Sequence, residues 1–269
     1  MDTGRTRMVA SCPSPRPPRR EAWLVERARG QRVEVDTRGA SRRVRLIEIV
    51  GPAGSGKTTL VRALRQRYPR LVVGVALSKL RLAPHFAANA LRLLPAYLSR
   101  HRDSRWLSRR ELRAMAYVNG WHRALSGERS SEGLTVFDHG PVFRLVRLRT
   151  FGPQLVQSDA FRRWSAKAVR DWAAMLDTVV WLDAPDEALV QRIQSRPDWH
   201  RVKTASPAAI REFLQRYREC YREVMAELLA IREIRVLEFR TDERSADELA
   251  EALLSGLGVG TGVPMGIPA

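Results

Sequence analysis

One segment carries residue types whose spacing suits a defined chemistry: Gly51-Pro52-Ala53-Gly54-Ser55-Gly56-Lys57-Thr58. Glycines at these positions let successive backbone N–H groups turn inward around an anion, where a Cβ would clash. Lys57 would supply a mobile positive charge for the β- and γ-phosphates of a nucleotide, and the Thr58 hydroxyl would bind Mg²⁺. The segment GxxxxGK[ST] therefore predicts a phosphate-binding loop. Its expected nucleotide contacts are Gly51, Ala53, Gly54, Ser55, Gly56, Lys57, Thr58 and Thr59.

The elements on either side of the loop support this prediction. Residues 44–50 form a β-branched apolar run that ends in glycine, and residues 57–68 repeat apolar side chains at helical spacing. The helix would direct the positive end of its dipole at the bound phosphate. For this composition a chance match to the motif has a probability on the order of 10⁻³. A strand, a phosphate loop and a helix are thus expected in succession.

Strands and helices are predicted to alternate along the rest of the chain. The predicted strands are 44–50, 71–75, 134–137, 178–182 and 234–239; the predicted helices are 57–68, 83–99 with a kink at Pro95, 108–125, 153–176, 186–195, 206–230 and 245–257. Parallel strands need crossover connections, which are usually helical. The expected fold class is therefore α/β, a P-loop NTPase three-layer sandwich in which a five-stranded parallel sheet is flanked by helices.

The composition changes at both ends of this pattern. Residues 1–43 are rich in proline and arginine and are predicted to be a basic, partly disordered extension with one short helix near 21–29. Residues 258–269 are rich in glycine and proline and are predicted to be a flexible tail. The domain is expected to cover 44–257, with a helical insert at about 79–126.

Positive charge dominates the composition. The 47 Lys and Arg residues against 29 Asp and Glu give a net charge of +18, and only four of the 47 are lysines. Such charge favours phosphate-bearing partners, whether nucleotide, nucleic acid or anionic lipid, although an arginine excess of this kind also arises from coding bias. The two isolated cysteines indicate neither a zinc site nor disulfides. With no apolar stretch long enough to span a membrane and no secretory leader, a cytoplasmic protein is expected.

Residues 44–257 resemble the P-loop nucleoside and nucleotide kinase group, thymidylate kinase and deoxynucleoside kinases especially. Beyond the phosphate loop, the resemblance rests on FDHG at 137–140, on VVWLDAP at 179–185 with the arginines after it, and on VLEFRTDERSADELAEAL near the C-terminus. It implies ATP and Mg²⁺ as cofactors. It also implies transfer of the γ-phosphoryl group to a nucleoside, a nucleotide or a similar small acceptor.

The resemblance implies roles for residues beyond the loop. Asp138 matches the acidic residue at the end of the third strand, which acts as base toward the acceptor hydroxyl or helps to hold Mg²⁺. His139 stands where these kinases usually carry arginine, and Arg144 or Arg147, one and two helical turns later, could supply that charge.

A predicted lid at about 192–204 would close over the transferring phosphoryl group. Its Arg192 and Arg196 would clamp that group, because planar guanidinium groups can bridge phosphoryl oxygens in the transition state. Two further cations in this segment, Arg201 and Lys203, are weaker candidates.

Acceptor recognition is expected in the helical insert and after Asp138. The candidates are Lys79, Arg81, Arg113, Tyr117, Trp121 and His122. Trp121 could stack on a base, although a tryptophan on an amphipathic helix usually packs in the core. Two tyrosines on the long C-terminal helix, Tyr217 and Tyr221, are expected in the core as well.

Other P-loop classes fit less well. A regulatory GTPase should carry NKxD, yet neither Asn89 nor Asn119 precedes a lysine. LSGE at 125–128 is similar to an ABC ATPase signature, but it lies too close to Asp138, and His139 occupies the place of the catalytic glutamate. Three alternatives stay open: a kinase for another kind of small molecule, a polynucleotide 5′-end kinase or ATP-dependent nucleic-acid-binding module, and a non-catalytic nucleotide-binding protein. The oligomeric state is not indicated.

Overall fold

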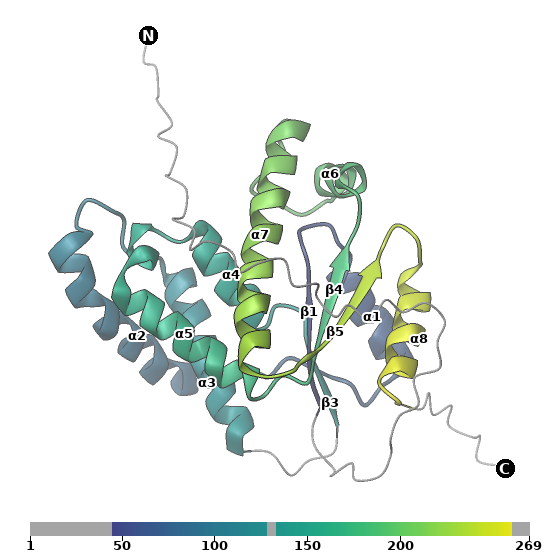
Figure 1. Ribbon diagram of the computed structural model, residues 1–269, viewed down its shortest axis with the longest axis horizontal. Helices are drawn as coiled ribbons and strands as arrows, with labels where there is room; N and C mark the ends of the chain where they lie inside the picture. Colours follow the sequence, from purple (N-terminus) through teal and green to yellow (C-terminus); the bar gives the residue numbers. More distant parts are fainter. Residues whose placement is uncertain (1–44, 128–132, 260–269) are drawn as a thin grey trace.

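Five parallel strands form the centre of the molecule, in the order β2-β3-β1-β4-β5 (Figure 1). The computed structural model describes residues 45–127 and 133–259. The predicted N-terminal extension, Val44 and residues 260–269 of the predicted tail lie outside the described residues. The strands are β1 (Arg45–Val50), β2 (Val72–Val73), β3 (Leu134–Phe137), β4 (Thr178–Asp183) and β5 (Arg235–Arg240).

Helices cover both faces of this sheet. They are α1 (Lys57–Arg67), α2 (Lys79–Arg100), α3 (Arg109–Gly127), α4 (Pro141–Phe151), α5 (Asp159–Ala173), α6 (Asp186–Ser195), α7 (Pro207–Ile231) and α8 (Ala246–Gly256), with a short 3₁₀ helix η1 (Gln154–Gln157). Helices α1 and α8 lie on one face, and α3, α4, α5 and α7 on the other (Figure 1). The expected three-layer α/β fold is therefore confirmed.

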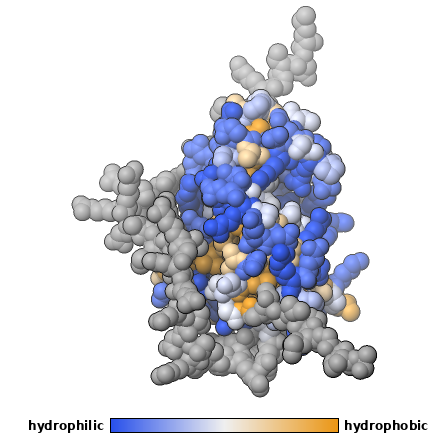
Figure 2. Space-filling model, turned by 90° about the vertical axis from the view of Figure 1, so that its right-hand side faces the viewer, coloured by the Kyte–Doolittle hydropathy of each residue, from blue (hydrophilic) through white to orange (hydrophobic). Residues whose placement is uncertain are grey.

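Each face of the sheet has its own apolar core. On one face Leu60 and Leu64 of α1 pack with Leu253 of α8 and with the strands. On the other, Trp164 and Trp172 of α5 are almost fully buried with residues of α3, α4 and α7. The outer surface over α1 and α8 is mainly hydrophilic (Figure 2). Burial of one stripe per helix accounts for the amphipathic spacing in the sequence.

The strand order determines where a site can form. Strand β1 lies between β3 and β4, although neither of them is the next strand in the sequence. In open α/β sheets ligands bind beyond the carboxyl ends of the strands, where the order of connection reverses. The segments after β1, β3 and β4 meet at this edge. They contain the phosphate loop, Asp138 and Asp183.

Several element boundaries differ from the sequence-based ones. The second strand is reduced to Val72–Val73 at the edge of the sheet, and α2 begins at Lys79 because the Ser78 side chain caps it. The predicted 153–176 helix is divided at Ser158, which caps α5 after the 3₁₀ turn. Helix α2 contains Pro84 and Pro95 and is assigned as one helix. Within the described ranges, no helix has the length and apolarity needed to cross a membrane.

Candidate active site

The phosphate loop joins β1 to α1 through three glycines with positive φ. Gly51 has φ 144°, and Gly54 and Gly56 each have φ 82°. A Cβ on Gly51 would lie 2.1 Å from the carbonyl oxygen of Leu182 on β4, so only glycine fits beside that strand. The motif is thus bent sharply around the carboxyl edge of the sheet, as its glycine spacing predicts.

Lys57 is folded back into this loop. Its Nζ donates to the backbone carbonyls of Gly51 and Pro52, each at 2.8 Å. Burial lowers the pKa of Lys57 to about 8; the nearby Arg196 lowers it further, and Asp138 and Asp183 oppose the shift. The ammonium therefore sits among carbonyl groups that a phosphate chain would have to replace as its partners.

Asp138 lies directly opposite Thr58, as the magnesium prediction requires. The Thr58 hydroxyl donates to Asp138 Oδ2 at 2.9 Å, joining the end of β3 to the start of α1. The other carboxylate oxygen, Oδ1, is buried without a hydrogen-bond partner in the described structure. The Thr58 hydroxyl and the Asp138 carboxylate, one of whose oxygens has no partner, fit Mg²⁺. This ion prefers oxygen ligands and is usually held by one or two protein groups plus phosphates and water. Within the described ranges, no group of three or more His, Cys, Asp or Glu side chains is arranged to hold a metal ion.

A buried acid that sequence reasoning missed supports the Asp138 turn. Both oxygens of Glu48 on β1 accept backbone N–H bonds at the start of α4, from Val142 at 2.9 Å and Phe143 at 2.8 Å. Burial raises the pKa of Glu48 to about 8 in spite of these bonds and of the nearby Arg144. A Cβ on Gly140 would lie 2.7 Å from Glu48 Cδ. Glu48 therefore fixes the start of α4 and, through it, the position of Asp138.

His139 lies at the edge of the same turn. Its Nδ1 is 3.5 Å from Asp138 Oδ2, and its ring packs edge-on against Phe143 with the centroids 4.4 Å apart. Burial lowers the pKa of His139; Asp138 opposes this shift, and Lys57, Arg144 and Arg147 add to it. A neutral imidazole near pH 7 follows, so His139 does not supply the missing arginine charge.

The predicted lid arginines have different surroundings. Arg192 on α6 donates to the Gly54 carbonyl at 3.3 Å and to both the hydroxyl and the carbonyl of Thr241 at 2.9 Å. Arg192 thus joins α6 to the phosphate loop and to the end of β5. Arg196 makes only a long ion pair with Asp198 at 3.8 Å, and its charge acts on Lys57. Of the two, Arg196 has the guanidinium that is less occupied by protein groups.

A second acid missed by sequence reasoning, Asp183, is the last residue of β4. Arg218 on α7 makes two bonds of 2.9 Å with Asp183 and one of 2.6 Å with Asp186. The pair of parallel bonds to one carboxylate is the geometry that arginine makes best. This cluster joins α7 to the end of β4. A lone arginine in an arginine-rich helix gives no sequence signal for it.

The acceptor candidates of the helical insert do not lie in one place. Tyr117 and Trp121 on α3 both contact the Arg144 guanidinium, whose Cζ is 4.7 Å from each ring centroid. Trp121 is buried and donates to the Val75 carbonyl at 2.7 Å, so it belongs to the core. The His122 ring packs against Trp172 of α5, on the core side of α3. Tyr217 and Tyr221 are buried as expected.

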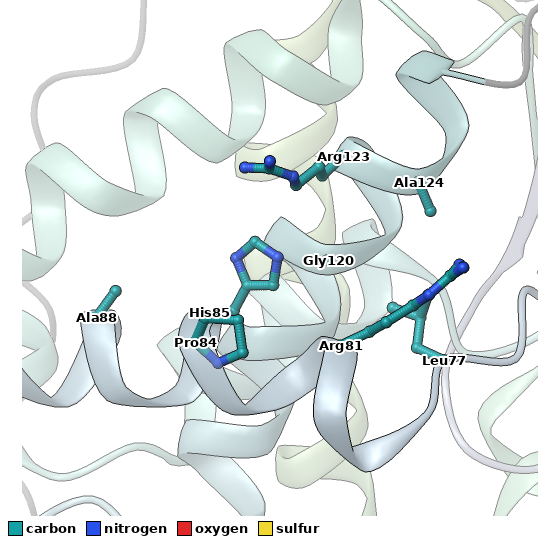
Figure 3. A pocket seen from close by; sticks show the side chains of 8 residues that line it. All are labelled: Leu77, Arg81, Pro84, His85, Ala88, Gly120, Arg123 and Ala124. Atoms are coloured by element: carbon teal, nitrogen blue, oxygen red, sulfur yellow. The ribbon is translucent and has the colours of Figure 1, made fainter.

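Arg81 lines a separate pocket between α2 and α3 (Figure 3). The pocket has a volume of about 660 Å³ and is lined by residues of the insert alone: Leu77, Arg81, Pro84, His85, Ala88, Gly120, Arg123 and Ala124. Its lining includes no residue of the phosphate loop. Arg81 therefore lies apart from Lys57 and Asp138, and Lys79 at the start of α2 is not among the lining residues.

These features define a P-loop protein, with a phosphate loop at the carboxyl edge of a parallel sheet and an acid opposite its threonine. Residues 46–220 match a family model described as "AAA domain". The chain belongs to this AAA-domain family. The family model and the strand order thereby confirm the expected P-loop α/β fold.

Comparison with solved structures finds proteins similar in fold. Deoxyadenosine kinase from M. mycoides, with products bound, has a TM-score of 0.44 and 11% identity over 79% of this chain and 98% of its own. The YorR protein of Bacillus subtilis, in complex with phosphorylated GDP, has a TM-score of 0.45 and 16% identity over 80% and 96%. Shikimate kinase from Acinetobacter baumannii, with shikimate, has a TM-score of 0.36 and 16% identity over 80% and 93%. Comparison with curated protein sequences finds no match.

Proposed function

We propose that this protein is an ATP- and Mg²⁺-dependent phosphotransferase that moves the γ-phosphoryl group to a small acceptor. The observation that carries the proposal is the pairing of Thr58 with Asp138 at 2.9 Å, next to Lys57 and at the carboxyl edge of the sheet. A phosphate loop alone would serve a binding protein. An acid with one unpartnered buried oxygen beside that loop is suited to proton transfer or metal binding as well.

Each residue has a role in the proposed reaction. The backbone of residues 51–58 holds the triphosphate, and Lys57 exchanges its two carbonyl partners for phosphate oxygens. Mg²⁺ held by Thr58 and Asp138 would neutralise charge on the phosphates. The acceptor hydroxyl oxygen bonds to the γ-phosphorus, the bond from that phosphorus to the β,γ-bridging oxygen breaks, and ADP leaves. The hydroxyl proton passes to Asp138, whose Oδ1 has no other partner.

Stabilisation of negative charge in the transition state would account for most of the rate enhancement. The transferring phosphoryl group carries negative charge on its outer oxygens, which preorganised cations stabilise without much reorganisation. Lys57 and Arg196 are the cations closest to this role. Arg192 would act mainly by holding α6 against the phosphate loop, since its guanidinium bonds to Gly54 and Thr241.

Two substitutions test the proposal with ADP release from Mg·ATP in the presence of mixed hydroxyl acceptors. Lys57→Ala should lower kcat/KM by about 10³-fold or more, several kcal/mol of barrier, because one phosphate-binding cation is lost. Asp138→Asn should lower kcat more than it weakens Mg·ATP binding, measured by calorimetry. The control is Lys167→Ala, which removes an exposed ion pair on α5.

The outcomes separate the open alternatives. Full turnover in Lys57→Ala would contradict the mechanism. Tight Mg·ATP binding without turnover for any acceptor would favour the non-catalytic nucleotide-binding alternative. Equal losses of kcat and nucleotide affinity in Asp138→Asn would leave Asp138 a metal-holding role only.

A further inference from the structure

Four arginines on elements around the Asp138 turn make no ion pair with a carboxylate among the described residues. Arg113 is on α3, Arg144 and Arg147 are on α4, and Arg201 is in the predicted lid; we call them the arginine cluster. Other arginines of the same surface are paired: Arg105 with Glu111 at 2.7 Å and Arg149 with Glu227 at 2.6 Å. Unlike these two arginines, the four members of the arginine cluster make no ion pair with a carboxylate among the described residues.

Arg144 is the most enclosed member of the cluster. Its guanidinium lies 4.7 Å from the ring centroids of both Tyr117 and Trp121, and its Nε is buried without a hydrogen-bond partner in the described structure. Stacking on two rings fixes the orientation of the guanidinium without using its N–H groups. The Arg144 guanidinium thus makes no hydrogen bond to a protein group in the described structure.

The other members of the cluster adjoin Arg144. Arg113 lies one helical turn before Tyr117 on α3, and Arg147 lies one turn after Arg144 on α4. A further turn along α4, Phe151 contacts Arg201, whose Cζ is 4.2 Å from the ring centroid. α3, α4 and the predicted lid thus each contribute arginines to the cluster.

Electrostatics show that these charges affect one another. Burial lowers the pKa of Arg144 to about 10, against the attraction of Tyr117 and Glu48, and Arg147 and Arg113 lower it further. Burial also lowers the pKa of Arg201; Arg147 adds to that shift and Glu111 opposes it. Like charges that nearby carboxylates balance only in part destabilise the folded state unless an anion binds among them.

The cluster adjoins the proposed reaction centre. Arg144 and Arg147 are on α4, which begins at Pro141, three residues after Asp138. The face of Tyr117 is occupied by Arg144, and Trp121 is buried, so neither ring presents a free face for a nucleobase. The groups nearest the acceptor position therefore offer positive charge and N–H donors rather than an aromatic stack.

We propose that the arginine cluster binds an anionic group of the acceptor, a phosphate monoester or a carboxylate, and thereby selects acceptors that carry such a group beside the reacting hydroxyl. This inference rests on the proposed phosphotransferase function and names the class of its acceptor. It adds no bond-forming step. Uncharged nucleosides and sugars would leave the four guanidinium groups without a counter-ion and would bind weakly.

The test compares matched pairs of compounds on the full chain saturated with Mg²⁺ and an unreactive ATP analogue. One arm pairs nucleosides and sugars with their phosphate monoesters, and a second pairs hydroxycarboxylates with their amides. Calorimetry or thermal shift measures binding. At least one charged compound should bind about tenfold or more tightly than its neutral partner. The arm in which the preference appears distinguishes phosphate from carboxylate.

Variants assign the preference to the cluster. Arg147→Ala and Arg113→Ala should each weaken binding of the charged compound about tenfold and leave binding of the ATP analogue unchanged. Arg144→Lys keeps the positive charge but removes the planar guanidinium group, so it tests whether a guanidinium stacked on the two rings is needed for binding. The matched control is Arg110→Ala, which removes an exposed arginine one turn before Arg113 on α3 and should behave as wild type.

The results separate this inference from the proposed function. Equal binding of charged and neutral partners, no binding by any member of the panel, or an undiminished preference in Arg147→Ala would overturn the anionic acceptor. Weakened analogue binding in Arg147→Ala would also overturn it, because the cluster would then bind the nucleotide. Failure of the wild-type protein to bind the ATP analogue would instead remove the proposed function.

Discussion

The two ends of the site differ in how their charges are balanced. At the phosphate loop the polar groups have partners within the protein: Lys57 bonds to two carbonyls, and Thr58 bonds to Asp138. At the arginine cluster, four guanidinium groups have ring contacts or none, and no carboxylate among the described residues. The first end is built from consecutive residues, whereas the second is assembled from two helices and the lid.

This difference indicates which residues mainly stabilise the fold and which mainly serve ligand binding. Groups that are satisfied within the chain stabilise the fold before any ligand arrives. Unbalanced charge costs stability and is retained where a ligand supplies the opposite charge. Substitutions at the loop end should therefore destabilise the protein, while those at the cluster should affect ligands and leave stability nearly unchanged.

The largest effect is expected for Gly51→Ala. The new Cβ would lie 2.1 Å from the Leu182 carbonyl oxygen at a φ of 144°, so β1 and β4 could not keep their present separation. The free energy of unfolding should fall by about 3 kcal/mol or more, measured by denaturant titration. Gly256→Ala is the control, since nothing lies within 4 Å of its Cβ and the change should be within about 1 kcal/mol. Similar stability of both variants would show that the loop end is not tightly constrained.

An intermediate effect is expected for the pH dependence that Glu48 causes. Its pKa is raised from 4.5 to about 8, so the folded protein holds a proton that the unfolded chain has lost. This contribution to stability is complete below pH 4.5 and is lost as the pH rises through 8. Between pH 5 and pH 8 the wild type should lose about 3–4 kcal/mol more than Glu48→Gln. Parallel pH profiles for the two proteins would contradict this, and the exposed Glu251→Gln should follow the wild type.

The smallest effect is expected for the stability of Arg147→Ala. Removal of one charge from a like-charged cluster should leave the free energy of unfolding within about 0.5 kcal/mol of wild type, or raise it slightly at low salt. Denaturant titration at two salt concentrations measures this, beside Arg110→Ala. A loss above about 1 kcal/mol would place Arg147 among the structural residues and would remove the contrast between the two ends.

Residues that are consecutive in the chain were the most predictable. The phosphate loop was identified in full because its eight positions define both the backbone bend and the cation. The helix at 186–195 was predicted with its observed bounds, and the Ser245 and Glu248 capping box begins α8 close to its predicted start. Such features depend on local spacing, which a sequence displays directly.

Residues that act across the fold were harder to predict. Glu48 is one charged residue in an apolar strand, and nothing near it indicates that it binds the start of α4 ninety residues later. Asp183 and Arg218 meet only because α7 returns to the end of β4. Arg144 and Arg147 were named as replacements for a missing arginine, but their contact with α3 depends on helix packing. The expected strand order is enough to place Asp138 near the phosphate loop. It does not determine where the side chains of Glu48, Arg218 and Arg144 lie.

Arginine side chains connect both ends of the predicted lid to the body of the protein. At its first residue, Arg192 bonds to Gly54 and Thr241; after its end, Arg218 bonds to Asp183 and Asp186. Residues 196–206 lie between these two anchor points and include both Arg196 and Arg201. Any change in the conformation of this segment would move both guanidinium groups, the one proposed for the transferring phosphoryl group and the one proposed for the acceptor.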